Sequence, residues 1–113
     1  MVTTERDIKL TRGDTFGFNF AIKDKTGNEP ALDAVYFSVK AKPDDTSYVF
    51  QKTLNDGITA LSGGGYYVKI EPSDTEDLTG ERYYYDLQVN IDDDVFTPLK
   101  GRLEIKWDVT REA

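Results

Sequence analysis

The segment YYYDLQVNI, residues 83–91, alternates apolar or aromatic side chains with polar ones over its whole length. Successive side chains of a β-strand point to opposite faces, so strict alternation predicts a strand with one buried face. The predicted core face carries Tyr83, Tyr85, Leu87, Val89 and Ile91, and the opposite face carries Tyr84, Asp86, Gln88 and Asn90. A strand of this kind has to bury its apolar face against another layer.

The same period of two recurs along the chain. The clearest segments are FGFNFAI (16–22), VYFSVKAK (35–42), GYYVKIE (65–71) and GRLEIKW (101–107); weaker ones are DIKL (7–10), SYVFQKTL (47–54) and DVFTPL (94–99). Their predicted core positions include Phe16, Phe18, Phe20, Ile22, Val35, Phe37, Val39, Ala41, Tyr48, Phe50, Leu54, Tyr66, Val68, Ile70, Val95, Leu99, Leu103, Ile105 and Trp107. Pro98 cannot donate to a strand ladder, so it predicts an edge position or a bulge.

Turn chemistry separates these segments. Loops or turns are expected at 24–30, 42–45 and 62–65, a hairpin turn at Asn55-Asp56-Gly57, and a hairpin tip at 92–94. Residues 72–78 lack strand character, and Pro72 followed by Ser73 and acids predicts one helical turn near 73–78 with a Ser or Asp cap. Seven or eight short strands with almost no helix predict an all-β fold, an antiparallel β-sandwich. The tyrosine described next makes the expected sandwich immunoglobulin-like. We expect a single domain, 1–113, with an ordered core of about 7–108.

A tyrosine marks the start of the longest strand. In DLTGERYYYDLQV, residues 77–89, Leu78 and Gly80 precede Tyr83. Immunoglobulin-like sandwiches often place a tyrosine here whose hydroxyl bonds back across the corner before the sixth strand. Tyr83 is the favoured residue for this corner and Tyr84 its rival, although a core position alone also suits Tyr83.

Composition argues against chemistry. The chain has no Cys and no His, which removes disulfides, thiol nucleophiles and the commonest general base. We therefore expect that the protein is not an enzyme, that it has no catalytic residues and that it binds no cofactor. Asp44-Asp45 and Asp92-Asp93-Asp94 lack the spacing of a calcium loop, so they are interpreted as solvated turns and no metal is expected.

Charge and hydropathy also limit the partners. Asp and Glu outnumber Lys and Arg 21 to 14, a net charge of −7. Such a surface repels nucleic acid and anionic membranes. No apolar stretch is long enough for a membrane helix, and MVTTERDIKL lacks the apolar core of a signal peptide, so assembly in the cytoplasm is expected.

Two sequence features can each be interpreted as functional or as purely structural. Tyr36, Tyr67 and Tyr84 fall on the polar side of their strands, as interface residues or as simple cross-strand pairs. Arg12-Gly13-Asp14 is the tripeptide that integrins read on adhesive ligands. It lies between two strand segments, where Gly13 permits a tight turn, so a structural turn is the interpretation.

Three longer stretches resemble a known family: IKLTRGDTFGFNFAIKDKTGNEPALD (8–33), GGGYYVKIEPSDTEDLTGERYYYDLQV (63–89) and KGRLEIKWDVTR (100–111). Together they resemble the small immunoglobulin-like modules of tailed phages and prophages of Gram-positive bacteria, in particular the N-terminal domain family of the baseplate upper protein. The resemblance implies a non-enzymatic virion structural protein of tail, baseplate or neck. Its partners would be other virion proteins or copies of itself, in an oligomeric arrangement within the assembled particle.

Two other functions remain open from the residues alone. An immunoglobulin-like adhesin module of a bacterial cell surface would be accompanied by an export signal, a wall anchor or tandem domains. A carbohydrate-binding module would gather exposed aromatic side chains on one sheet or at one loop end, with Tyr36, Tyr67 and Tyr84 as the candidates.

Overall fold

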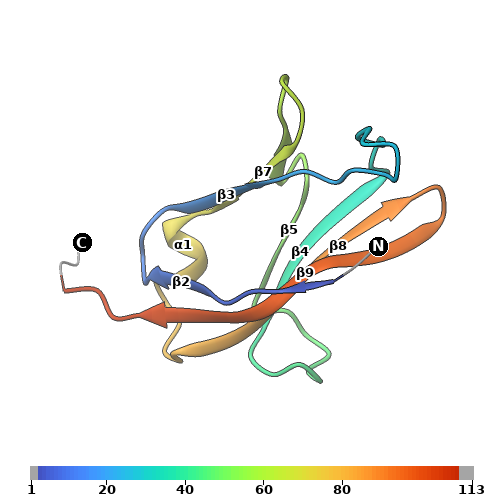
Figure 1. The fold of residues 1–113 in the computed structure, drawn as a ribbon. Helices are drawn as coiled ribbons and strands as arrows, with labels where there is room; N and C mark the ends of the chain where they lie inside the picture. The colour runs from blue at the N-terminus through green and yellow to red at the C-terminus, as the bar shows by residue number, and fades with distance from the viewer. Residues whose placement is uncertain (1–2, 110–113) are drawn as a thin grey trace.

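The computed structural model describes residues 3–109, which form strands and one short helix (Figure 1). The elements are β1 (Thr4–Glu5), β2 (Ile8–Thr11), β3 (Phe16–Phe20), β4 (Ala34–Lys40), β5 (Phe50–Leu54), β6 (Gly57–Ala60), β7 (Tyr66–Ile70), α1 (Pro72–Thr75), β8 (Arg82–Ile91) and β9 (Asp94–Lys106). The predicted all-β class with one helical turn is confirmed. In the described residues no helix has the length and apolar character needed to cross a membrane.

The strands form one continuous hydrogen-bonded path. Its order is β1-β9-β8-β4-β5-β6-β7-β3, and β2 also pairs with β9. The path curls into a half-barrel, so that β3 and β7 lie across the molecule from β4, β8 and β9 (Figure 1). This differs from the expected seven or eight antiparallel strands in two separate sheets, because nine strands are present within residues 3–109 and β1–β9, β2–β9 and β5–β6 pair in parallel.

The turn at Asn55-Asp56-Gly57 is what keeps the path continuous. A hairpin was expected here, but β5 and β6 pair in parallel register, with Thr53 opposite Gly57. Asn55 and Gly57 both have positive φ, 70° and 96°. The chain therefore steps sideways here and continues in the same direction, so that β6 lies beside β5 and the hydrogen-bonded path runs on to β7 and β3.

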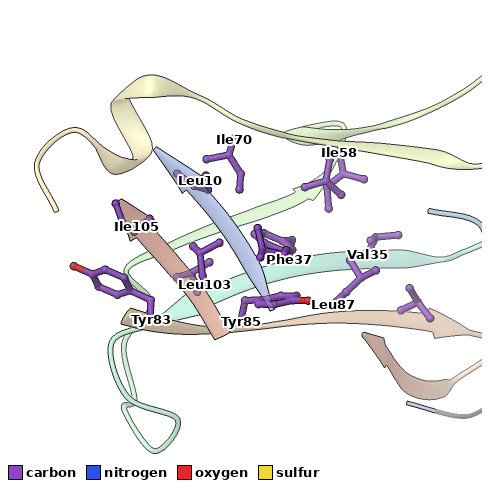
Figure 2. Close-up of a cluster of buried hydrophobic side chains, with 14 of the residues drawn as sticks. Leu10, Val35, Phe37, Ile58, Ile70, Tyr83, Tyr85, Leu87, Leu103 and Ile105 are labelled. Carbon is purple, nitrogen blue, oxygen red and sulfur yellow. The ribbon is translucent and has the colours of Figure 1, made fainter. Parts of the chain in front are cut away.

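The core fills the inside of the curl. Figure 2 shows Ile58 and Ile70 facing Phe37, Val35 and Leu87 across it. Its buried apolar members are Ile8, Leu10, Ile22, Leu32, Val35, Phe37, Val39, Ile58, Val68, Ile70, Tyr83, Tyr85, Leu87, Val89, Leu103 and Ile105. The alternation therefore predicts the inward face of the long strands correctly.

Four predicted core positions are exposed instead. Ala41 and Tyr48 lie in the loop between β4 and β5, where the strand pattern no longer applies. Val95 is next to the hairpin tip. Trp107 follows the end of β9 and is 58% exposed. Its ring lies 4.1 Å from the Arg12 guanidinium, and its Nε1 donates to Glu81 at 3.1 Å.

The Arg12-Gly13-Asp14 tripeptide forms a turn, as predicted. The Asp14 N–H donates to the Thr11 carbonyl at 3.1 Å, and Gly13 has φ of 80°, as the third residue of a type II turn requires. The Gly13 N–H donates at 2.8 Å to the hydroxyl of Thr75, which is fully buried in α1. Arg12 is itself only 7% exposed, so the tripeptide does not present an arginine to an adhesion receptor.

The predicted tyrosine corner is present at Tyr83. Its hydroxyl accepts the Gly80 N–H at 2.9 Å, and its ring is buried. A Cβ at Gly80 would lie 2.8 Å from that hydroxyl, so the close approach needs glycine. Tyr84, the rival, points to the other face.

Local signals for the remaining turns succeed in part. Asp92 and Asp93 form the expected hairpin tip with positive φ at both residues, and Ile91 pairs with Asp94. The β8–β9 register shifts by one residue between the pairs Leu87–Leu99 and Val89–Phe96. Pro98 therefore lies at a bulge, one of the two positions predicted for it. The helical turn is shorter than expected, and its N-cap is Glu71 rather than Ser or Asp. The Glu71 N–H donates to the Asp74 carboxylate at 2.7 Å, which explains the earlier start.

Candidate functional site

The outer face of the curled sheet carries a hollow of about 880 Å³. Strands β4, β5, β8 and β9 form its floor, β1 lies along one side, and the loop of residues 41–49 supplies another wall. Tyr36 of β4 and Tyr84 of β8, both predicted to face outward, line it. We call this concavity the tyrosine hollow.

Strand register explains how the hollow is lined. Directly opposite residues of neighbouring strands point to the same face. One row runs across five strands, from β5 to β1, and consists of Gln51, Ser38, Asp86, Lys100 and Glu5. Within it, Gln51 Nε2 donates to Ser38 Oγ at 2.9 Å, and Lys100 Nζ lies 3.7 Å from Glu5 Oε1. The row therefore spans the sheet with polar groups through its centre.

Aromatic side chains flank this polar row on both sides. Tyr84 lies in the neighbouring row, opposite Lys40 on β4 and Arg102 on β9. Tyr36 lies on the other side of the row, opposite Gln88. A ligand in the tyrosine hollow would therefore meet aromatic rings on either side of a hydrogen-bonding strip.

Asp86 is the electrostatic centre of the hollow. Burial raises the pKa of its carboxyl above the usual range, and the positive charges of Lys40 and Lys100 offset only part of that rise. Among residues 3–109, neither lysine forms an ion pair with the Asp86 carboxylate. Asp86 is thus a half-desolvated carboxylate whose negative charge is poorly compensated within the described chain.

Asn90 contributes an unsatisfied polar atom to the hollow. The Oδ1 atom of Asn90 is buried and accepts no hydrogen bond from the described residues. Asn90 shares the outward face of β8 with Asp86 and lines the same hollow. Buried polar atoms normally have partners, so Asn90 Oδ1 offers an acceptor site that a docked molecule can use.

Sequence reasoning missed several members of the hollow. Tyr48 was placed in the core, yet it is 51% exposed and stands on the loop wall, where Lys40 Nζ lies 5.4 Å from its ring centroid. Asp86, Lys40 and Lys100 gave no local signal, because their juxtaposition depends on strand pairing. Alternation did place Asp86 and Lys40 on the outward faces of their strands.

Tyr67, the third predicted interface residue, does not join the other two. It lies on β7, opposite Asn19 of β3, on the other side of the curl from the tyrosine hollow. Its ring covers Gly17, where an added Cβ would collide with the phenol. Tyr36 and Tyr84 thus form one surface and Tyr67 belongs to another.

The aspartates considered as metal ligands lie in turns or apart from one another. Residues 3–109 bring together no group of three or more Asp or Glu side chains that could hold a metal ion. Asp45 instead accepts the Lys42 N–H at 3.1 Å, inside its own turn. The charges lining the tyrosine hollow balance, with Glu5, Asp7 and Asp86 against Lys40, Lys100 and Arg102, in a chain of net charge −7.

Comparison of the sequence with protein-family models gives no match, and comparison with curated proteins gives no significant match.

Proposed function

We propose that this protein is a non-enzymatic structural module of a phage or prophage virion, in the tail, baseplate or neck, and that it acts by docking to other virion proteins. The tyrosine hollow is the observation that carries the docking role. Tyrosine supplies a large, rigid contact surface with a polar tip, and it is enriched at protein interfaces. Asp86 and Asn90 add acceptors that lack full compensation in the free chain.

Strand pairing supports the immunoglobulin-like part of this proposal. In immunoglobulin constant-type domains, one sheet holds the neighbours B, E and D and the other holds C, F and G. Here β3, β7 and β6 are successive neighbours, as are β4, β8 and β9. With β3 taken as B, β4 as C, β6 as D, β7 as E, β8 as F and β9 as G, the two sets correspond. Tyr83 is the second residue of β8, the strand equivalent to F, and its hydroxyl reaches back to Gly80 before that strand.

The resemblance to baseplate modules supports the virion part. The stretches that carry it fall on structural features that the fold depends on: the Arg12-Gly13-Asp14 turn, helix α1 and the Tyr83 corner. The proposed virion protein would be assembled in the cytoplasm and incorporated in repeated copies. Its neutral, tyrosine-lined hollow would face a partner without the repulsion that the acidic remainder produces.

The virion role is tested by mass spectrometry of density-purified particles released after induction of the encoding bacterium. We expect peptides of this chain at a fixed ratio to the major tail protein, and that ratio gives the symmetry of the ring or collar. Complete particles that contain none of it would exclude a virion component. In the same particles, Tyr36→Ala/Tyr84→Ala should prevent incorporation, while Thr59→Ala, an exposed change on β6, should not.

A carbohydrate-binding module is the second candidate. The gathering of Tyr36, Tyr48 and Tyr84 around amide and hydroxyl groups favours it, because such modules place aromatic rings beside hydrogen-bonding side chains. A glycan array separates the two functions. Binding that disappears in the Tyr36→Ala/Tyr48→Ala/Tyr84→Ala variant would favour the carbohydrate role, and an array without any signal for the unaltered protein would remove it.

A further inference from the structure

Strand β3 ends the sheet path with an open edge. It pairs with β7 on one side, and the backbone hydrogen bonds of residues 16–20 within the described chain all go to that neighbour. An edge strand presents a row of free N–H and C=O groups to any other strand that approaches. Figure 1 shows β3 at the outside of the curl.

The two ends of the path are protected very differently. At the other end, β1 and β2 are two and four residues long, and Glu5, Asp7 and Lys9 place charges along that edge. Short strands and charged side chains are the usual means of blocking edge-to-edge pairing. The β3 sequence, FGFNF, has no charge and no proline. Its edge is therefore the unprotected one.

The inward face of β3 is also incompletely covered. Phe16, Phe18 and Phe20 pack against the core but are only partly buried, unlike the fully buried residues opposite them on β7 such as Val68 and Ile70. The Phe18 ring contacts Phe37 edge-on, with centroids 5.6 Å apart. An additional strand beside β3 would cover the exposed sides of these rings.

We propose that β3 pairs with β3 of a second copy of this chain, antiparallel across a two-fold axis at Phe18. The sequence FGFNF supports this occupant because it reads almost identically in both directions. Phe16 comes opposite Phe20 of the second copy, Gly17 opposite Asn19, and Phe18 opposite Phe18. All three phenylalanines then stay on the core side, which the two-residue period of a strand requires.

Charge supports antiparallel over parallel pairing. Asp14 precedes β3 and Lys23 follows it, and both are exposed. Antiparallel pairing brings the acidic end of one strand toward the basic end of the other, whereas parallel pairing brings like charges together. The net charge of −7 disfavours self-association through the acidic parts of the surface, and the uncharged β3 edge avoids that repulsion.

Tyr67 lies beside this proposed contact. Its ring fills the space over Gly17, and in the dimer Gly17 faces Asn19 of the second copy. The tyrosine predicted from sequence as an interface residue thus flanks the pairing edge, separate from the tyrosine hollow. The proposal rests on β3 and its neighbours alone and does not depend on the virion role.

Engineered disulfides test both the pairing and its register. The chain has no cysteine, so background cross-linking is absent. Thr15 and Ala21 are exposed and would be directly opposite each other in the dimer. An equimolar mixture of Thr15→Cys and Ala21→Cys should form the mixed disulfide dimer under mild oxidation. Each variant alone should not, because equal positions lie roughly 20 Å apart at about 3.4 Å per residue.

A charge placed on the edge tests the same dimer without a cross-link. We expect concentration-dependent dimerisation of the unaltered chain in sedimentation equilibrium and loss of it in Asn19→Lys, since edge lysines block strand pairing. Thr59→Lys is the matched control. Thr59 and Asn19 both lie opposite Tyr67 on the same face, but Thr59 is on the interior strand β6. Monomers at millimolar concentration, or equal cross-linking in the single-variant samples, would overturn the proposal.

Discussion

The guanidinium of Arg12 donates to Oδ1 of Asp108 from both Nε and Nη2, at 3.1 and 2.8 Å. The pair joins the turn after β2 to the segment that follows β9, and its side chains are 8% and 12% exposed. Trp107 covers it from one side. A solvent-shielded ion pair thus fixes two ends of the described chain that are 96 residues apart in sequence.

Removing one partner should be costly, because the other is left poorly solvated. We expect Arg12→Ala to lower the free energy of unfolding by about 3 kcal/mol in urea denaturation. Lys9→Ala is the control, because the exposed Lys9 side chain lies 3.8 Å from Glu104 and its loss should cost less than about 1 kcal/mol. Similar small losses in both variants would show that the Arg12 pair contributes no more than a surface contact.

Gly80 and Tyr83 should be energetically coupled. A Cβ at Gly80 would press on the Tyr83 hydroxyl and displace the hydrogen bond, so Gly80→Ala should cost about 1–2 kcal/mol. In a Tyr83→Phe background the hydroxyl is gone and the same change should cost less. A double-mutant cycle measured by thermal unfolding gives the coupling, for which we expect more than about 0.5 kcal/mol. Strict additivity would argue against a tyrosine corner that depends on glycine.

Tyr85 should make stability fall at high pH. Burial raises the pKa of this phenol from 10.0 to about 12, and its hydroxyl donates to the Arg6 carbonyl at 2.6 Å. The folded state therefore holds this proton more tightly than the unfolded chain. The protonated Tyr85 phenol therefore stabilises the folded state fully below pH 10, and this contribution is lost as the pH rises through 12.

The comparison that isolates this effect is with Tyr85→Phe. At neutral pH the variant should be less stable by about 1 kcal/mol, the value of the lost hydrogen bond. The difference in stability between the two proteins should narrow between pH 10 and 12. In the absorbance titration of the folded protein, the tyrosine that ionises near pH 12 should disappear. A gap that stays constant over this range would contradict the shifted pKa.

The features that could be predicted from sequence are those that depend on a single strand or turn. The inward and outward faces of β4 and β8 follow from alternation, and the Arg12-Gly13-Asp14 turn follows from glycine. The path of the sheet does not, because the parallel step from β5 to β6 depends on backbone conformations around Gly57. Lys52 interrupts an apolar pattern for a reason visible only in three dimensions, since its ammonium reaches Asp74 of α1 at 2.7 Å.

The tyrosine hollow shows the same limit. Outward tyrosines could be found one strand at a time, but nothing local indicates that Tyr36 and Tyr84 come together while Tyr67 lies across the curl. Tyr48 was misplaced because its loop continues an alternating pattern beyond the strand. Functional surfaces assembled from several strands depend on register, and register is a property of the whole sheet.

Asp86 should trade stability for binding. Burial raises the pKa of its carboxyl, so the folded state binds this proton more tightly than the unfolded chain does. The stability that comes from this tighter proton binding is fully present below the pKa of the unfolded chain. It is lost as the pH rises through the pKa of the folded state, so at neutral pH the folded protein holds a partly desolvated carboxylate. Asp86→Asn removes that charge with little change of shape. We expect its melting temperature to exceed that of the unaltered protein at pH 7 and the difference to vanish near pH 3.

The same variant should dock poorly, because the tyrosine hollow loses its central acceptor. Incorporation into purified particles is the readout, with melting curves recorded on the same samples. Asp56→Asn is the matched control: it makes the same chemical change at an exposed turn outside the hollow and should alter neither property. If Asp86→Asn is less stable than the unaltered protein yet docks normally, Asp86 has a structural role, and the hollow has to bind through its tyrosines alone.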